Sequence, residues 1–108
     1  MVTAEYSDKD HEHVLTLRGH AGAAPKGEDL ICAGVTTLVE ALAACLLDMR
    51  KKKLTHKCLL SLGDGVAAFD VIGGEGAKDL VAGAFSTTVA GLQWLSDNYP
   101  DFVKFKIL

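Results

Sequence analysis

Two long apolar segments constrain the fold of this chain more than any other feature. Residues 30–47 contain a single charged residue, Glu40, and residues 80–95 contain none. In both, apolar side chains recur at three- and four-residue spacings, which predicts helices. A membrane span needs about 20 predominantly apolar residues, whereas the second segment is shorter and the first has Glu40 and hydroxyl groups near its middle. We therefore expect no membrane insertion but two buried helices, packed on a sheet and with a second side available to another subunit.

Alternating apolar and polar residues flank both apolar segments. Five segments share this pattern and are predicted to be strands: residues 2–6, 13–19, 56–62, 66–72 and 102–107. Residues 7–10 and 63–65 have the composition of turns. With helices over residues 30–52 and 78–97, the order is β-β-α-β-β-α-β. This order predicts one α+β domain over residues 1–108, with two layers in which two helices pack on a largely antiparallel sheet.

Composition and charge exclude several classes of protein. A chain of 108 residues with 49% apolar residues is not a disordered one. The formal net charge of −3 leaves no basic footprint for nucleic acid, so we expect none as a partner. The first residues, M-V-T-A-E-Y, lack the basic and apolar regions of an export signal. An odd number of cysteines, three, then indicates reduced thiols and a cytoplasmic location.

Residues 19–36 bring together the residue types needed for nucleophilic catalysis. His20 ends a predicted strand, Asp29 precedes an apolar run as a helix N-cap does, and Cys32 falls in the first helical turn. Unpaired backbone N–H groups and the helix dipole favour a thiolate there, and the same N–H groups could stabilise an oxyanion. A cysteine, a histidine and a carboxylate so close in sequence therefore indicate nucleophilic acyl transfer.

The other cysteines and histidines have structural or solvent-exposed interpretations. Cys45 is expected to fill the core along the first helix, and Cys58 to be buried in a strand. His11 and His13 flank a turn without a cysteine or carboxylate cluster to complete a metal site, so we expect both to be exposed and no metal to be bound. His56 opens a strand and belongs to no motif, which makes it a weak candidate for pairing with a cysteine.

The residues of the 19–36 segment also carry a resemblance to a known family. G-H-A-G, followed by G-x-D-x-x-C-A-x-V-[ST], resembles the ribosomal-processing cysteine protease family known as Prp, and chain length and element order agree with that family. Its histidine and cysteine are the catalytic pair, which the resemblance places on His20 and Cys32. An aspartate and a hydroxyl residue recur beside that pair and correspond to Asp29 and Thr36.

This sequence departs from the family pattern at three positions. Thr36 stands where serine is usual but keeps the hydroxyl. Gly34 replaces a second alanine, which weakens the helix by roughly 1 kcal/mol. Ala23 replaces an aromatic residue, which affects contacts of the loop with substrate more than the chemistry. That loop is either a plain connection or a lid that closes over substrate. The loop positions expected to serve substrate binding are Gly19, Ala21, Gly22 and Gly27.

The resemblance implies a reaction and a substrate. His20 would remove the proton from Cys32 or hold its thiolate as an ion pair, and would then protonate the leaving amine. Asp29 would cap the helix or orient His20, and Thr36 would bond a backbone carbonyl or shape the pocket. The family removes an N-terminal extension from a bacterial large-subunit ribosomal protein, number twenty-seven of the L series, during ribosome maturation. A homodimer without a cofactor is also implied.

Two other functions are compatible with the same residues. In a non-catalytic module, the G-H-A-G loop would contact a peptide or a second subunit, and Cys32 would be an inert helix residue. In a redox sensor, Cys32 would respond to oxidation without hydrolysing peptides. Peptide turnover that depends on both Cys32 and His20 distinguishes a protease from these two alternatives.

Overall fold

The computed structural model describes residues 1–25 and 29–108, and these form two helices and five strands. Along the chain the elements are β1 (Val2–Lys9), β2 (Glu12–Arg18), α1 (Leu30–Lys51), β3 (Thr55–Gly63), β4 (Val66–Gly73), α2 (Lys78–Asn98) and β5 (Val103–Ile107). The order β-β-α-β-β-α-β is the predicted one. Both helices begin at the predicted residues and end within one residue of the predicted positions.

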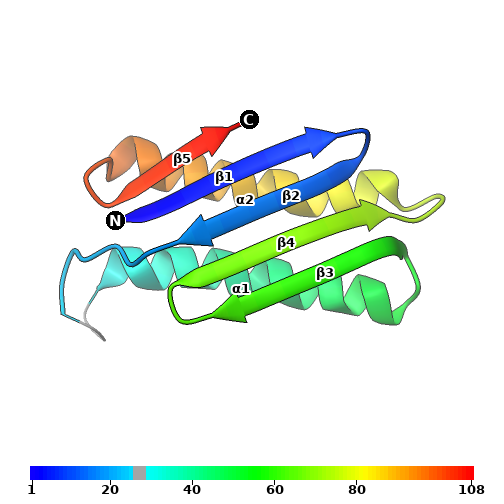
Figure 1. Ribbon diagram of the computed structural model, residues 1–108, viewed down its shortest axis with the longest axis horizontal. Coiled ribbons are helices and arrows are strands. Elements are labelled where there is room, and N and C mark those ends of the chain that lie inside the picture. The colour runs from blue at the N-terminus through cyan, green and yellow to red at the C-terminus, as the bar shows by residue number, and fades with distance from the viewer. Residues whose placement is uncertain (26–28) are drawn as a thin grey trace.

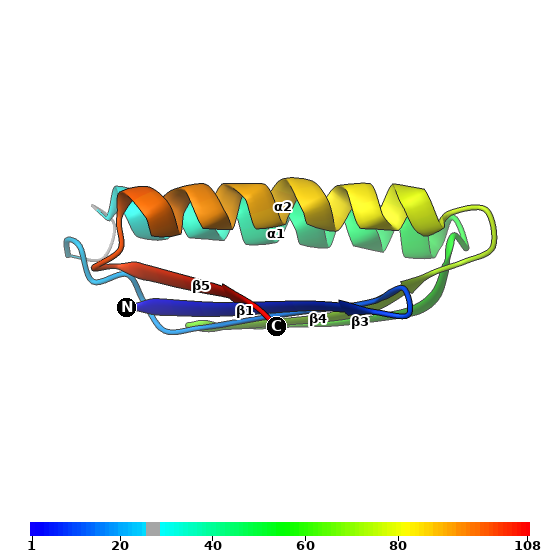
Figure 2. The ribbon, with the colours of Figure 1, turned by 90° about the horizontal axis from the view of Figure 1, so that it is seen from above.

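The strands form a single sheet in the order β3-β4-β2-β1-β5 (Figure 1). The pairs β1–β2, β2–β4 and β3–β4 are antiparallel, and β5 runs parallel to β1. Both helices cover the same face of the sheet (Figure 2). The prediction of a two-layer α+β fold with a largely antiparallel sheet is therefore confirmed.

A single layer of side chains between the helices and the sheet forms the core. Full burial of each large apolar side chain contributes about 1.5–3 kcal/mol. The helices supply one set of these residues: Val35, Val39, Leu42, Leu46 and Met49 from α1, and Val81, Phe85, Leu92 and Leu95 from α2. The sheet supplies a second set, which includes Leu15, Leu17, Cys58, Phe69 and Val71. Cys58 is buried in its strand as predicted, and burial raises the pKa of its thiol.

The outer face of α1 is less covered than the sequence predicts. Cys45 is exposed and lies outside the buried stripe, although we expected it in the core. Its neighbour Leu46 takes the inward position, and an adjacent helical residue points about 100° away. By length and composition α1 could cross a membrane, but core helices of soluble proteins share these properties, and the buried stripe of α1 packs on the sheet.

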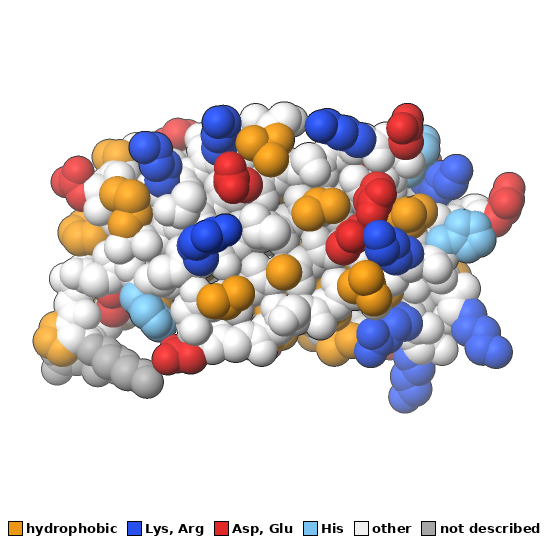
Figure 3. All heavy atoms as spheres, viewed as in Figure 1, with side chains coloured by type: hydrophobic (Ala, Val, Ile, Leu, Met, Phe, Trp, Pro, Cys, Tyr) orange, Lys and Arg blue, Asp and Glu red, His pale blue; other side chains and the backbone are white. Residues whose placement is uncertain are grey.

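The opposite face of the sheet is open to solvent and mixes apolar with charged side chains (Figure 3). On this face Lys57 forms two ion pairs. Its ammonium nitrogen lies 2.8 Å from a carboxylate oxygen of Glu12 and 2.8 Å from one of Asp70. The ammonium group holds the pKa of the Asp70 carboxyl below its usual range. This ionic bridge joins β2, β3 and β4 across the face that no helix covers.

The turn between β1 and β2 is shorter than predicted. Residues 7–10 have turn composition, but β1 continues through Lys9, and Ser7 and Asp8 pair with β2. The reversal falls on Asp10 and His11, which have φ angles of 53° and 65°. Two consecutive left-handed residues match the twist of a tight hairpin, so the two-residue turn replaces the longer one.

His13 is buried, contrary to our expectation that it would be exposed. Only 2% of His13 is accessible, because it shares the inward face of β2 with the leucines that follow at two-residue spacing. Its ring stacks on Phe85 with 5.0 Å between centroids. A hydrogen bond of 2.7 Å joins the Tyr6 hydroxyl to Nδ1 of His13, so the buried ring has a polar partner. Burial, more than the nearby Asp8 charge, raises the pKa of Tyr6 to about 12.

Burial of His13 makes the fold sensitive to acid. Desolvation lowers the pKa of His13 below its ordinary value of 6.5, so the unfolded chain binds this proton at higher pH than the folded chain does. The stability contribution is complete above pH 6.5 and is lost as the pH falls toward the depressed folded-state pKa. Urea unfolding at pH 7.5 and 5.5 should show a larger loss in the natural protein than in His13→Phe. Equal losses in the two proteins would contradict this assignment.

Candidate active site

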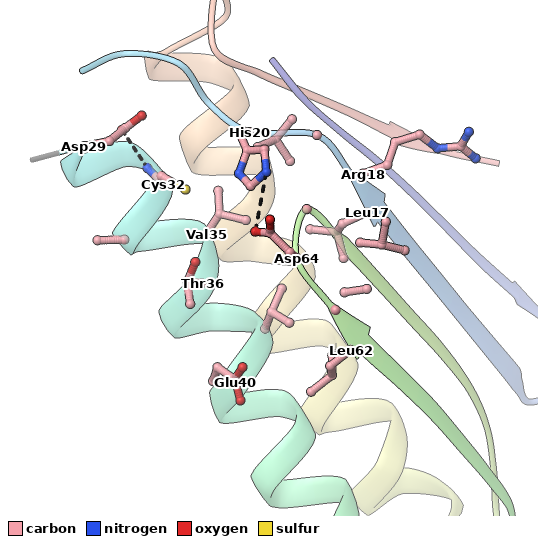
Figure 4. Close-up of a pocket in the computed structure, with 18 of the residues that line it drawn as sticks. Leu17, Arg18, His20, Asp29, Cys32, Val35, Thr36, Glu40, Leu62 and Asp64 are labelled. Carbon is pink, nitrogen blue, oxygen red and sulfur yellow. Dashed lines mark hydrogen bonds and ion pairs between the residues drawn. The ribbon is translucent and has the colours of Figure 1, made fainter. Parts of the chain in front are cut away.

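An open cleft of about 820 Å³ lies between the first half of α1, the end of β2 and the β3–β4 turn (Figure 4). The predicted residues His20, Asp29, Cys32 and Thr36 all line it. Gly63 at the end of β3 and the turn residues Asp64 and Gly65 close one side. The fold therefore brings residues from three segments of the chain into one cavity of a size suited to a ligand.

Asp29 caps α1, as its position in the sequence predicts. Its Oδ1 accepts a hydrogen bond of 2.9 Å from the backbone N–H of Cys32, and its Oδ2 accepts one of 3.0 Å from the N–H of Ala23. These bonds, above all the one from Cys32, lower the pKa of the Asp29 carboxyl. With both carboxylate oxygens bonded to the backbone, Asp29 fixes the helix start and the preceding loop.

Cys32 lies in the first turn of α1, half-buried against the core. Figure 4 shows its sulfur on the side of the helix that faces His20 across the cleft. Among the described residues, no hydrogen bond joins the two side chains. The N–H of Cys32 already binds Asp29, so in this state that group is not free to bind an oxyanion. The positive end of the helix dipole still acts on the sulfur.

His20 follows β2 and stands in front of the β3–β4 turn. Its Nε2 lies 3.6 Å from Oδ1 of Asp64, and both side chains are largely exposed. A hydrogen bond of 2.8 Å from the N–H of Gly19 to the carbonyl of Gly65 joins the two segments. A Cβ atom on Gly65 would lie 2.8 Å from Nε2, so the ring occupies space that only glycine leaves open.

Sequence reasoning treated Asp64 as a turn residue and missed its contact with His20. Strand pairing explains the contact, because β2 and β4 are antiparallel and Arg18 pairs with Val66. The residues after β2 therefore lie beside the residues before β4. The contact between His20 and Asp64 could have been predicted only from a strand order that places β4 beside β2.

The remaining predicted residues occupy different places. Thr36 lies on the cleft wall one helical turn beyond Cys32, and Gly19 and Gly22 also line the cleft. Ala21 is only 3% exposed and packs into the core instead. Gly27 lies outside the residues that the structure describes. In residues 1–25 and 29–108 no group of three or more histidine, cysteine or acidic side chains is placed to hold a metal ion.

A thiol at a helix N-terminus that faces an imidazole across an open cleft is the arrangement of a cysteine hydrolase. The family model described as cysteine protease Prp matches residues 1–104. The chain therefore belongs to the Prp family of cysteine proteases. A comparison with curated proteins found no match.

Solved structures share the fold over the full length of the chain. The crystal structure of SMU.848 from Streptococcus mutans has a TM-score of 0.72 and 26% identity, and the match covers 100% of this chain and 94% of that one. Ribosomal processing protease Prp from S. aureus, with a covalently linked product peptide, has a TM-score of 0.77 and 18% identity, with 100% of both chains covered. The same S. aureus protein with a substrate peptide has a TM-score of 0.69 and 16% identity, again with 100% of both chains covered.

The contact between Gly65 and the His20 ring predicts a selective loss of activity in Gly65→Ala. Gly65 has a φ of 69°, and Gly76 has a φ of 80° with no atom near its Cβ position. Alanine in a left-handed conformation costs about 1–2 kcal/mol, so both Gly65→Ala and Gly76→Ala should lose similar stability in urea unfolding. Peptidase assays should show a further loss in Gly65→Ala alone, because the new methyl group displaces the imidazole. Equal activity of the two variants would contradict this prediction.

Proposed function

We propose that this chain is a cysteine endopeptidase in which Cys32 is the nucleophile and His20 is the general base and acid. The observation that carries the proposal is the shared cleft, in which the first turn of α1 presents Cys32 toward the imidazole that follows β2. Membership of a cysteine protease family supports the same reaction. The two residues lie on different elements, so the reaction needs the folded chain.

The proposed reaction proceeds through a thioester. His20 takes the proton from the Cys32 thiol, the sulfur forms a bond to the peptide carbonyl carbon, and the carbonyl electrons move to oxygen. When the tetrahedral intermediate collapses, the C–N bond breaks and the imidazolium protonates the leaving amine. A water molecule, deprotonated by His20, then attacks the thioester, and the thiol leaves with that proton. The helix dipole stabilises negative charge on sulfur and on the carbonyl oxygen.

We propose a ribosomal protein precursor as the substrate. The S. aureus protein with this fold is a ribosomal processing protease whose structures hold a product peptide and a substrate peptide. The corresponding substrate here is the N-terminal extension of large-subunit ribosomal protein number twenty-seven of the L series. The open cleft along α1 is accessible to an extended peptide from outside, as this reaction requires.

A homodimer and a cytoplasmic location belong to the same proposal. The outer side of α1 exposes small and apolar residues, and a second copy of the chain would cover them: Ala41, Ala44 and Leu47. The three cysteines are free, which suits a reducing compartment. Nucleic acid has no place in the proposal, because the net charge of the chain is −3.

The proposed roles of Cys32 and His20 predict that substitution of either abolishes peptide cleavage. Purified protein and a synthetic peptide that spans the junction of the ribosomal extension should give two products by mass spectrometry. Cys32→Ala removes the nucleophile and His20→Ala removes the proton acceptor, so each should reduce turnover by at least about 100-fold. Cys45→Ala, on the same helix but outside the cleft, is the matched control and should cleave normally.

The alternatives give different results in this assay. A peptide-binding module would bind the peptide in both variants without any cleavage by the natural protein. A redox sensor would lose its response to peroxide in Cys32→Ala and would cleave no peptide at all. Cleavage that persists in Cys32→Ala would refute the proposed nucleophile.

A further inference from the structure

We propose that Asp64 is a positioning residue that holds the His20 imidazole in the orientation and tautomer needed for proton exchange with Cys32. The inference rests on the proposed roles of His20 and Cys32 and adds a third side chain to them. Asp64 belongs to the β3–β4 turn, far in sequence from the segment that carries the other two residues.

The contact geometry assigns different tasks to the two ring nitrogens of His20. Nε2 lies 3.6 Å from Oδ1 of Asp64. In Figure 4 the other nitrogen is on the side of the ring that faces the first turn of α1 and the sulfur of Cys32. A carboxylate accepts hydrogen bonds and donates none, so Asp64 favours the tautomer with the proton on Nε2. That tautomer leaves Nδ1 free to accept the proton of the thiol.

The backbone around Asp64 is fixed relative to His20. Antiparallel pairing of β2 with β4 and of β3 with β4 holds both strands that enter the turn. The hydrogen bond between the N–H of Gly19 and the carbonyl of Gly65 joins the turn to the residue before His20. Gly65 leaves room for the ring directly beside the carboxylate. The side chains of His20 and Asp64 are exposed, but strand pairing and this hydrogen bond hold their backbones in a fixed relative position.

Among residues 1–25 and 29–108, Asp64 is the one carboxylate that lies within 4.0 Å of the His20 ring nitrogens. Both oxygens of Asp29 accept backbone hydrogen bonds at the start of α1. The charged or titratable groups that line the cleft with His20 are Asp64 from the turn, Asp29 and Cys32 from the helix start, Glu40 two turns further along α1, and Arg18 from β2. Of these, Asp64 has the acidic group that pairs with the imidazole. The two aspartates thus have different roles: Asp29 positions the sulfur of Cys32, and Asp64 positions the ring of His20.

The exposure of the pair sets the size of the expected effect. The side chains of His20 and Asp64 are 59% and 86% accessible, and an exposed ion pair changes an equilibrium by only about 1.4- to 5-fold. A bound peptide would displace water from the cleft, and the same pair would become stronger with less solvent around it. Catalytic hydrogen bonds are often long in the free enzyme and shorten in the complex. We therefore expect loss of the Asp64 charge to lower kcat by about three- to tenfold.

Asp64→Asn tests this role, with Asp10→Asn as the matched control. Both aspartates are turn residues, and Asp10 lies at the opposite end of the sheet, at the β1–β2 turn (Figure 1). With the ribosomal junction peptide, Asp64→Asn should lower kcat with little change in KM. Asp64→Glu, which restores the charge, should recover part of the lost kcat.

The outcomes separate this proposal from the one on which it rests. Asp64→Asn with the kcat of Asp10→Asn would overturn the role of Asp64, while inactive Cys32→Ala and His20→Ala variants would leave the nucleophile and base in place. A rise in KM without a fall in kcat would also overturn it, because that pattern describes substrate binding. Cleavage by Cys32→Ala would instead refute the proposed function itself.

Discussion

The hydrogen bond from the backbone of Cys32 to the carboxylate of Asp29 is the interaction on which the site depends. It fixes the residue at which α1 begins, and therefore which residue occupies the first turn and receives the field of the helix dipole. The second carboxylate oxygen binds Ala23 and ties the loop to the same point. A change in the cap would shift the helix start and move the sulfur relative to everything else in the cleft.

The other half of the site comes from the sheet rather than from the helix. The end of β2 carries His20, and the adjacent β3–β4 turn brings Asp64 to it through antiparallel pairing with β4. The two halves meet because both helices pack on one face of the sheet, and the start of α1 lies at the same end as this turn (Figure 1). The core thus sets the distance across the cleft, and local hydrogen bonds set the direction of each side chain.

Periodicity and local signals predicted the fold well, because amphipathic spacing, the cap at Asp29 and glycine-rich turns act over a few residues. The structure brings the four principal candidates, His20, Asp29, Cys32 and Thr36, to the walls of one cleft. The errors occurred where tertiary structure decides. The imidazole of His13 is polar and beside a turn, so the sequence predicted it to be exposed, yet stacking on Phe85 stabilises the ring in the core. Cys45 belongs to an apolar segment but lies beside the stripe of α1 that is buried. Asp64 lies next to His20 only because of the order in which the strands pair.

The most direct test of the account is the pH dependence of alkylation at Cys32 relative to Cys45, measured by peptide mapping after brief treatment with iodoacetamide. Cys45 lies exposed on the same helix, outside the cleft, and serves as an internal reference. The account predicts that, in the range of about pH 5.5–7, Cys32 reacts faster than Cys45, and that His20→Ala reduces this advantage. Parallel pH profiles for the two thiols, unchanged by His20→Ala, would contradict an activated nucleophile at Cys32.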